Sequence, residues 1–303
     1  RVKAFFGRIE GFLDGPAEND VAFNYKKGQF TDDTGQALVL LDSIESTDYE
    51  PDTRDIALRM LAWAEKENAF ENNILGPTSK VALANFRDNI QDSRITDKAL
   101  SNGSAMRIAP IGCLFRPEQK EDIARYVYLV SRATHTSDVT IAGAAMIAEA
   151  VSSAIVKDDF EKVMEDVFGI EEIGYGMGCE TFSPRLGERL RIGLDIAGSY
   201  KGDDEGFIHK LYDVVGTGVG IIESVPAALS VAYYAQDPNL SCLLCANMAG
   251  DTDTIGAMAT AVCGAFTGMG RIKPEYIRTL RQQNDADFDH YIRILEKGRE
   301  RFA

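Results

Sequence analysis

Hydrophobic residues recur three to four positions apart along much of the chain, which is the spacing of amphipathic helices. Such stripes occupy residues 37–44, 57–64, 141–155, 208–215 and 288–295. No long segment alternates hydrophobic and polar residues as a half-buried strand would. The pattern therefore predicts an all-α fold of about a dozen helices joined by glycine-rich loops.

Two of the apolar segments are also rich in alanine and glycine, at residues 140–150 and 255–265. Small side chains let helix axes approach closely, so we expect these two helices to be central and buried. Residues 65–80 and 168–184 show no clear stripe and are predicted to be irregular loops. The charged, amphipathic stretch from Arg278 predicts a helix packed on the outside.

Composition narrows the possible partners. The 303 residues carry a net charge of -15, which repels nucleic-acid phosphates and anionic membranes, so we expect neither as a partner. A small anionic ligand remains compatible, because a metal ion or an arginine reverses the local field. No apolar run reaches the length of a membrane span. No linker-like composition interrupts the chain, so we expect a single domain over residues 1–303.

The cysteines indicate a reducing compartment. Five cysteines at irregular spacing do not suggest a disulfide framework, and we expect a cytoplasmic protein. Cys242 and Cys245 form a CxxC pair without the further ligands that zinc needs. We therefore expect these two cysteines to belong to the core.

A first candidate for chemistry is the acidic cluster Thr31, Asp32, Asp33 and Thr34, directly before the stripe at residues 37–44. Threonine and aspartate at a helix start commonly cap free backbone N–H groups, and that explanation covers one or two of these residues. Two adjacent aspartates between two threonines exceed what a cap requires. Capping and ion binding both remain open for this segment.

A second cluster repeats this chemistry at Asp251, Asp253 and Thr254, again at the entry to an apolar helix. Gly250 allows the backbone to come close there. Carboxylate and hydroxyl oxygens suit hard cations such as magnesium or manganese, and a bound dication removes the cost of burying the carboxylates. If the two clusters meet across a helical core, they could hold a pair of metal ions.

Two further segments carry polar groups at predicted turns. Ser101, Asn102, Gly103 and Ser104 could cradle an anion or sugar hydroxyls, or serve as an ordinary helix cap. Arg107 could bind phosphate or pair with an acid. His135 has no serine or cysteine nucleophile motif beside it, so a catalytic triad is a weak interpretation and a structural histidine is the commoner one.

These segments, in this order, resemble the ADP-ribosylglycohydrolase family, which includes hydrolases of ADP-ribosyl-arginine and ADP-ribosyl-serine and the J-class lens crystallins. The matching stretches are Thr31–Thr34, Ser101–Arg107, Thr134–His135 and Gly250–Ala257. The resemblance covers nearly the whole chain. The pairing of the first acidic cluster with the second is its most specific feature.

The resemblance implies a single compact orthogonal helical bundle holding two Mg²⁺ ions, or Mn²⁺ in some members. It implies metal ligands at Thr31, Asp32, Asp33, Asp251, Asp253 and Thr254, with Asp33 and Asp253 as the catalytic pair. It also implies that Ser101, Asn102, Gly103, Ser104 and His135 line the ribose and phosphate site. Family members usually carry a GlyAspAla loop and a catalytic glutamate, and we expect both to precede residue 1. Glu223 is the fallback proton donor, although capping explains it better.

The implied activity is hydrolysis of a ribosyl N- or O-glycosidic bond, with an ADP-ribosylated protein as the default substrate. A nucleoside-type or other small ribosyl metabolite is an alternative ligand. A non-catalytic relative, either crystallin-like or a binder of ADP-ribose, is a second alternative. The intact set of four aspartates argues against that last interpretation.

Overall fold

The structure is a computed structural model that describes residues 6–18, 22–72 and 74–303. Within these ranges the ordered elements are helices, with two isolated bridges, Ser101 to Gly220 and Ser137 to Cys179, in place of any sheet. This confirms the all-α prediction. The α-helices are α2 (Asp32–Ser46), α3 (Thr53–Lys66), α4 (Pro77–Arg87), α5 (Arg94–Asp97), α6 (Ala109–Gly112), α7 (Lys120–Ser131), α8 (Asp138–Ala154), α9 (Phe160–Tyr175), α10 (Leu186–Ser199), α11 (Asp204–Val214), α12 (Ile221–Ala235), α13 (Pro238–Asn247), α14 (Thr252–Thr267), α15 (Pro274–Gln283) and α16 (Phe288–Arg301).

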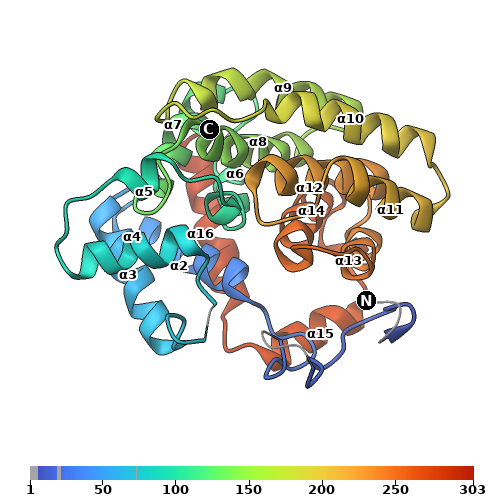
Figure 1. Cartoon of the computed structure of the whole chain (residues 1–303), viewed down its shortest axis with the longest axis horizontal. Coiled ribbons are helices and arrows are strands. Elements are labelled where there is room, and N and C mark those ends of the chain that lie inside the picture. Colours follow the sequence, from blue (N-terminus) through green and yellow to red (C-terminus); the bar gives the residue numbers. More distant parts are fainter. Residues whose placement is uncertain (1–5, 19–21, 73) are drawn as a thin grey trace.

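Helix α8 is the centre of the molecule, and all 17 of its residues are buried. Helices α6, α7, α9, α12 and α14 pack around it (Figure 1). The burial confirms the prediction from its alanine and glycine content. Helix α14 was predicted to be equally central, but only one face of it is buried. Among the described residues, no helix is both long enough and apolar enough to cross a membrane.

Two glycines explain how closely the helices approach α8. A Cβ atom at Gly143 would lie 2.7 Å from Ile221 Cδ1 on α12, and a Cβ at Gly174 of α9 would lie 2.6 Å from Ala142 Cα. Real Cβ atoms do not come so close to other atoms. Small residues at these crossings therefore set the positions of α9 and α12.

The predicted loop over residues 168–184 is wrong in its first half, because α9 continues to Tyr175. Val163, Val167, Ile170 and Gly174 are buried on one face, so the helical stripe crosses the predicted boundary. The predicted loop over 65–80 is shorter than expected, since α3 ends at Lys66 and α4 begins at Pro77.

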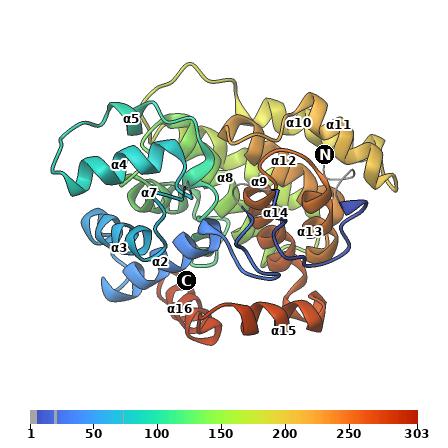
Figure 2. The same ribbon diagram turned by 60° about the horizontal axis from the view of Figure 1, so that its bottom comes forward.

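The C-terminal stretch forms two helices rather than one. Helix α15 ends at Gln283, and α16 begins at Phe288 after Asp287 accepts a hydrogen bond from the His290 backbone N–H. No residue of α15 is buried, and it lies at the lower edge of the molecule in Figure 2. The prediction of an outer, amphipathic position is confirmed.

The fold brings four distant segments together around one point. The start of α14 packs against α2, and the 3₁₀ turn η1 (Asn102–Ser104) packs against both α8 and α12. The turn that holds His135 directly precedes α8. The polar loops that the sequence analysis singled out therefore lie around the N-terminal end of α8.

Candidate active site

At the start of α2, the Thr31 side chain bonds to an aspartate and does not cap the helix backbone. Thr31 precedes the helix, and its hydroxyl donates to Asp33 Oδ2 at 2.6 Å without capping. Asp33 is buried, and its Oδ1 has no hydrogen-bond partner. Gln36 Nε2 donates to Asp32 Oδ2 at 3.3 Å. One carboxylate oxygen is thus left in the interior without a donor.

At the start of α14, backbone geometry fixes the second acidic cluster. Gly250 adopts φ +97°, and a Cβ atom there would lie 2.1 Å from the Thr217 carbonyl oxygen. The close approach lets the Asp251 N–H donate to that same oxygen at 2.7 Å. The Asp251 side chain then accepts from Asn102 Nδ2 at 2.6 Å, without capping the helix. Only glycine fits this turn, as its sequence position suggested.

The capping explanation is therefore wrong for Thr31, and Asp251 does not cap its helix either. Helices α3, α9, α11 and α13 do begin with an aspartate whose side chain accepts backbone N–H groups. Neither Thr31 nor Asp251 makes such a bond. Their side chains bond instead to other polar side chains, Thr31 to Asp33 and Asp251 to Asn102.

The two clusters act on each other electrostatically. Burial raises the pKa of Asp32 to about 8, with further contributions from the carboxylates of Asp33, Asp253 and Asp251. Burial and Asp253 likewise raise the pKa of Asp33, although the hydroxyls of Thr31 and Thr254 oppose the change. The pKa of Asp251 is raised chiefly by burial, with Asp253 and Asp33 adding to it. Clustered carboxylates with too few donors favour protonation or a cation.

The donor chemistry of this cluster fits a divalent metal ion. All six predicted ligands offer oxygen, and Asp33 Oδ1 is a buried acceptor without a partner. Nevertheless, across the described ranges no three His, Cys, Asp or Glu side chains are grouped so that they could hold an ion. Asp253 is exposed, whereas Asp33 and Thr254 are buried. The residues thus meet the chemical requirement but are not preassembled as a ligand set.

The predicted sugar-binding loop lies against the histidine. Ser101 Oγ is 3.0 Å from His135 Nε2, and Gly103 packs so closely that a Cβ there would lie 2.8 Å from His135 Cε1. Asn102 links this loop to Asp251. Ser104 differs, because it is fully buried and its hydroxyl donates to the Thr140 carbonyl on α8. Its side chain therefore anchors the loop on α8.

Arg107 was predicted either to bind phosphate or to pair with an acid, and its position does not fit phosphate binding. Its side chain is fully buried, donating to Gln36 Oε1 at 2.7 Å and to Thr134 Oγ1 at 2.6 Å. Burial lowers the pKa of Arg107 to about 10, against the opposing effect of Asp32. A ligand phosphate has no access to this guanidinium.

Several residues of the site escaped the sequence analysis. Gln36 bonds both Asp32 and Arg107, Thr78 accepts from Ser101 at 3.0 Å, and Thr217 holds the Asp251 backbone. Gln36 had a detectable signal, since a residue four positions after Asp32 lies on the same helix face. Thr78 lies in the first turn of α4 and Thr217 in a loop, and local spacing connected neither residue with the site.

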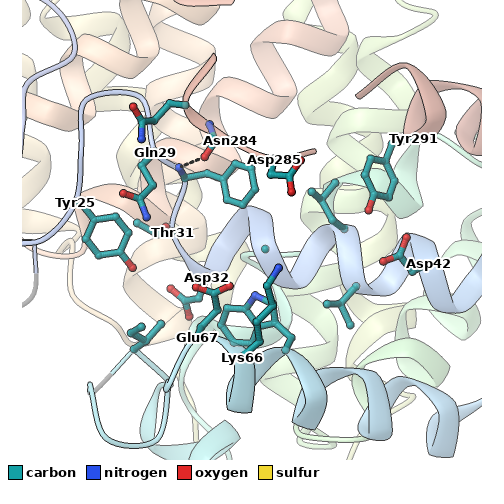
Figure 3. A pocket seen from close by; sticks show the side chains of 17 residues that line it. Tyr25, Gln29, Thr31, Asp32, Asp42, Lys66, Glu67, Asn284, Asp285 and Tyr291 are labelled. Atoms are coloured by element: carbon teal, nitrogen blue, oxygen red, sulfur yellow. Dashed lines mark hydrogen bonds between the residues drawn. The ribbon is translucent and has the colours of Figure 1, made fainter. Parts of the chain in front are cut away.

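A cavity of about 320 Å³ opens beside the first cluster (Figure 3). Of the predicted site residues, only Thr31 and Asp32 line it. Tyr25, Trp63 and Glu67 form other parts of its wall. Burial and the charges of Asp32, Asp253, Glu67 and Asp33 raise the pKa of Tyr25, so its phenol faces the acidic cluster.

Two minor predictions can be checked directly. Glu223 accepts from the Gly218 backbone N–H at 2.8 Å and so caps the turn before α12, as expected. Cys245 is buried in α13 and Cys242 is half-buried, so this pair contributes to packing. Neither observation adds a group to the acidic site.

An all-α fold with an acidic, threonine-rich site at two helix starts defines the class of protein. Residues 3–301 match the ADP-ribosylglycohydrolase family, and the chain belongs to it. This membership indicates a glycosidase-type hydrolase.

Individual relatives agree with this assignment. The chain is 42% identical over 301 residues to the uncharacterized protein YegU of Escherichia coli (strain K12), covering 99% of this chain and 90% of YegU. It is 24% identical over 289 residues to human ADP-ribosylhydrolase ARH3, covering 85% and 76% of the two chains. A solved "ADP-ribosylglycohydrolase-related protein complex" superposes with a TM-score of 0.65 at 20% identity, over 99% of this chain and 93% of that one, and so shares the fold.

Proposed function

We propose that this protein is a divalent-metal-dependent hydrolase that cleaves a ribosyl N- or O-glycosidic bond. The default substrate is an ADP-ribosylated protein side chain. The observation that supports this best is the convergence of Asp32, Asp33 and Asp251 with Asp253, in which burial and mutual repulsion raise three carboxylate pKa values. Two Mg²⁺ ions, or Mn²⁺, would balance the four negative charges.

The ligands in this proposal are Thr31, Asp32 and Asp33 from α2, with Asp251, Asp253 and Thr254 from α14. The exposed Asp253 side chain would have to turn inward, because the present arrangement does not enclose an ion. Bound metal would supply Lewis acidity and a more acidic water for a reaction that passes through an oxocarbenium-like state. Loss of Asp33 or Asp253 would therefore remove most of the turnover.

The other residues would hold the substrate. Ser101 is half-buried and lies against the buried His135 and Gly103, next to Asn102, and we assign this loop to the ribose and its phosphate. The cavity beside Asp32 has aromatic walls and the carboxylate of Glu67. That lining suits a neutral or cationic organic group better than a phosphate, so we place the leaving group there.

The test is a hydrolysis panel with ADP-ribosyl-arginine, ADP-ribosyl-serine and a set of nucleosides. Each substrate is incubated with Mg²⁺, with Mn²⁺, and with EDTA. We expect release of ADP-ribose from at least one modified amino acid, abolished by EDTA and restored by added metal. Turnover of nucleosides alone would support the small-metabolite alternative. Turnover undiminished by EDTA would overturn the metal-dependent mechanism, and no turnover of any substrate would support a non-catalytic relative.

A further inference from the structure

A buried chain of hydrogen bonds connects the acidic cluster with the sugar-binding loop, and Arg107 stands at its middle. One Arg107 nitrogen donates to Gln36 Oε1 at 2.7 Å, and Gln36 Nε2 donates to Asp32 Oδ2 at 3.3 Å. The other terminal nitrogen donates to Thr134 Oγ1 at 2.6 Å. Arg107 is fully buried, and its Nε has no partner. Burying a guanidinium with one donor unpaired lowers the stability of the fold. Its retention at this position calls for an explanation.

The direction of the first branch follows from the chemistry of arginine. A guanidinium carries only donors, so the Gln36 amide must present its oxygen to Arg107. The amide nitrogen then faces Asp32 as a donor. Arg107 therefore determines which end of Gln36 meets the carboxylate, and so orients a predicted metal ligand.

The second branch reaches the histidine. Thr134 Oγ1 accepts from Arg107 and lies 2.8 Å from His135 Nδ1. Thr134 is fully buried, and among the described hydrogen bonds Nδ1 is the acceptor available to its hydroxyl. A proton on Nδ1 would leave that hydroxyl hydrogen buried without an acceptor. The arrangement that satisfies every group puts the proton on Nε2.

The same logic orders the loop beyond the histidine. A protonated Nε2 donates to Ser101 Oγ at 3.0 Å, and the Ser101 hydroxyl then donates to Thr78 Oγ1 at 3.0 Å. The lone pairs and the hydrogen of Ser101 thus have assigned directions before any ligand arrives. A bound sugar hydroxyl would meet the half-buried Ser101 already oriented by the buried imidazole behind it.

We propose that Arg107 is a positioning residue that orients both halves of the site, Asp32 through Gln36 and His135 through Thr134. This inference rests on the proposed function for its consequence, but the protonation pattern it requires is independent of any substrate. Burial, reinforced by the charge of Arg107, lowers the pKa of His135 well below its ordinary value. A neutral ring is what the chain of donors demands.

The first experiment reads the imidazole nitrogens by NMR in ¹⁵N-histidine-labelled protein. The chain has three histidines, so the His135 signals are assigned by comparison with a His209→Gln and a His290→Gln variant. In the wild type we expect the proton on Nε2 and a hydrogen-bonded Nδ1. Arg107→Met frees the Thr134 hydroxyl to accept, so the proton should divide between the two nitrogens. Arg107→Lys, which keeps a cationic donor, should restore part of the wild-type pattern.

Removal of a buried arginine could unfold the protein, so a milder variant accompanies it. Thr134→Val replaces the hydroxyl between Arg107 and His135 by a methyl group of similar size. It should also remove the hydrogen bond to Nδ1 and divide the proton. Thr134→Ser keeps the hydroxyl and should retain the wild-type spectrum. A wild-type proton on Nδ1, or an Nε2 proton unchanged in both Arg107→Met and Thr134→Val, would overturn the inference.

The second experiment separates the two branches by calorimetry with Mn²⁺ alone and with ADP-ribose. Thr134→Val should weaken ADP-ribose binding roughly 10-fold and leave the Mn²⁺ affinity unchanged. Gln36→Met should weaken Mn²⁺ binding by roughly 10–100-fold and leave the His135 spectrum unchanged. Equal losses of both ligands in both variants would indicate general loosening and contradict the inference.

The two proposals fail in different ways. If the wild type binds neither Mn²⁺ nor ADP-ribose, the proposed function falls, whereas the orienting role of Arg107 is still decided by the His135 spectra. If the wild type binds both ligands but the position of the His135 proton is the same in the Arg107 and Thr134 variants, only the inference on Arg107 falls.

Discussion

Helices α13 and α14 follow each other in the chain, and each is preceded by an aspartate. The first aspartate caps its helix and the second does not. Asp237 accepts from the backbone N–H groups of Asn239 and Leu240 and pairs with Arg271. Although burial opposes it, these partners lower the pKa of Asp237. Asp251 makes no cap bond, and burial together with neighbouring carboxylates raises its pKa. The same residue type at the same helix position thus has its charged form favoured in one case and disfavoured in the other.

The difference shows what distinguishes a site from a structural helix end. A capping carboxylate has its donors within two or three residues, so its negative charge is satisfied locally. The carboxylates at the starts of α2 and α14 repel one another, and Asp33 Oδ1 is left without a donor. Burial and repulsion of this kind favour protonation or a bound cation over free charged carboxylates.

The largest expected effect comes from Asp33→Asn, which removes one charge while keeping the side-chain shape. Turnover should fall by more than the roughly 10–100-fold that accompanies loss of a group merely supporting a metal ligand. In EDTA the same variant should be more stable than the wild type at neutral pH, by roughly 1–3 kcal/mol, because a raised carboxylate pKa opposes folding. Turnover is measured with the substrate that the hydrolysis panel identifies, and stability by urea denaturation.

The matched control is Asp159→Asn at the start of α9, where the carboxylate caps the helix by accepting from the Glu161 N–H at 3.0 Å. Asparagine is also a good cap, so both turnover and stability should stay close to those of the wild type. If Asp33→Asn behaved like this control, the two kinds of helix start would not differ in function.

The sequence predicted the helices better than the contacts between them. Local spacing was enough to predict the helices at residues 37–44 and 57–64 and the small-residue helix α8. Apolar residues three to four positions apart indicate a helix whatever the rest of the chain does. The end of α9 did not follow, because its buried face continues into a segment rich in glycine and glutamate. Helix periodicity also gave no indication that the C-terminal stretch breaks after Gln283.

The site was predicted in its residue types but not in its internal connections. Carboxylates beside threonines signal a hard-cation site from composition alone. The bond from Asn102 to Asp251 joins residues 149 positions apart, and the burial of Arg107 depends on Gln36 and Thr134 from other segments. Such pairings depend on tertiary structure, so local patterns cannot reveal them. Arg107 was therefore assigned to phosphate or to an acid, and the neutral partners that it binds were not predicted.

A second prediction concerns the turn that places Asp251. Gly250→Ala should cost at least about 1–3 kcal/mol, because alanine is strained at φ +97° and its Cβ would lie 2.1 Å from the Thr217 carbonyl oxygen. The shift should also weaken metal binding, since the Asp251 N–H bonds that same oxygen. Urea denaturation and Mn²⁺ calorimetry measure the two losses.

The comparison variant lies on the same helix. A Cβ atom at Gly264 would meet nothing within 4 Å, so Gly264→Ala should be neutral or stabilise by about 0.5–1 kcal/mol. Equal behaviour of the two alanine variants would show that the turn at Gly250 does not determine the site.

A third prediction concerns Glu149, a buried carboxylate that lies within α8 and not at a helix start. One oxygen accepts from Lys120 at 2.8 Å and the other is buried without a partner. Burial raises its pKa to about 7, although Lys120 opposes the change. The folded protein then holds this proton to higher pH than the unfolded chain, so the stability it contributes is lost as pH rises from about 4.5 through about 7.

The Glu149→Gln variant should lack this dependence. Between about pH 5 and about pH 8, the wild-type unfolding free energy should fall by roughly 1–3 kcal/mol more than that of the variant. Turnover at neutral pH should be unchanged, because Glu149 lies toward the C-terminal end of α8, the candidate site lies at its N-terminal end, and the ion-pair partner of Glu149 is Lys120. Parallel pH profiles would contradict the assignment of that proton to Glu149.

The smallest effect tests the capped side of the comparison. Asp237→Ala removes the acceptor for two backbone N–H groups at the start of α13 and should cost about 0.5–2 kcal/mol of unfolding free energy. Asp237→Ser keeps a capping oxygen and should recover most of that loss, since the exposed Arg271 contributes little through its ion pair. Neither variant should change turnover or Mn²⁺ affinity. A loss of metal binding in Asp237→Ala would mean that the start of α13 is coupled to the site at α14, and the two helix starts could no longer be treated as independent.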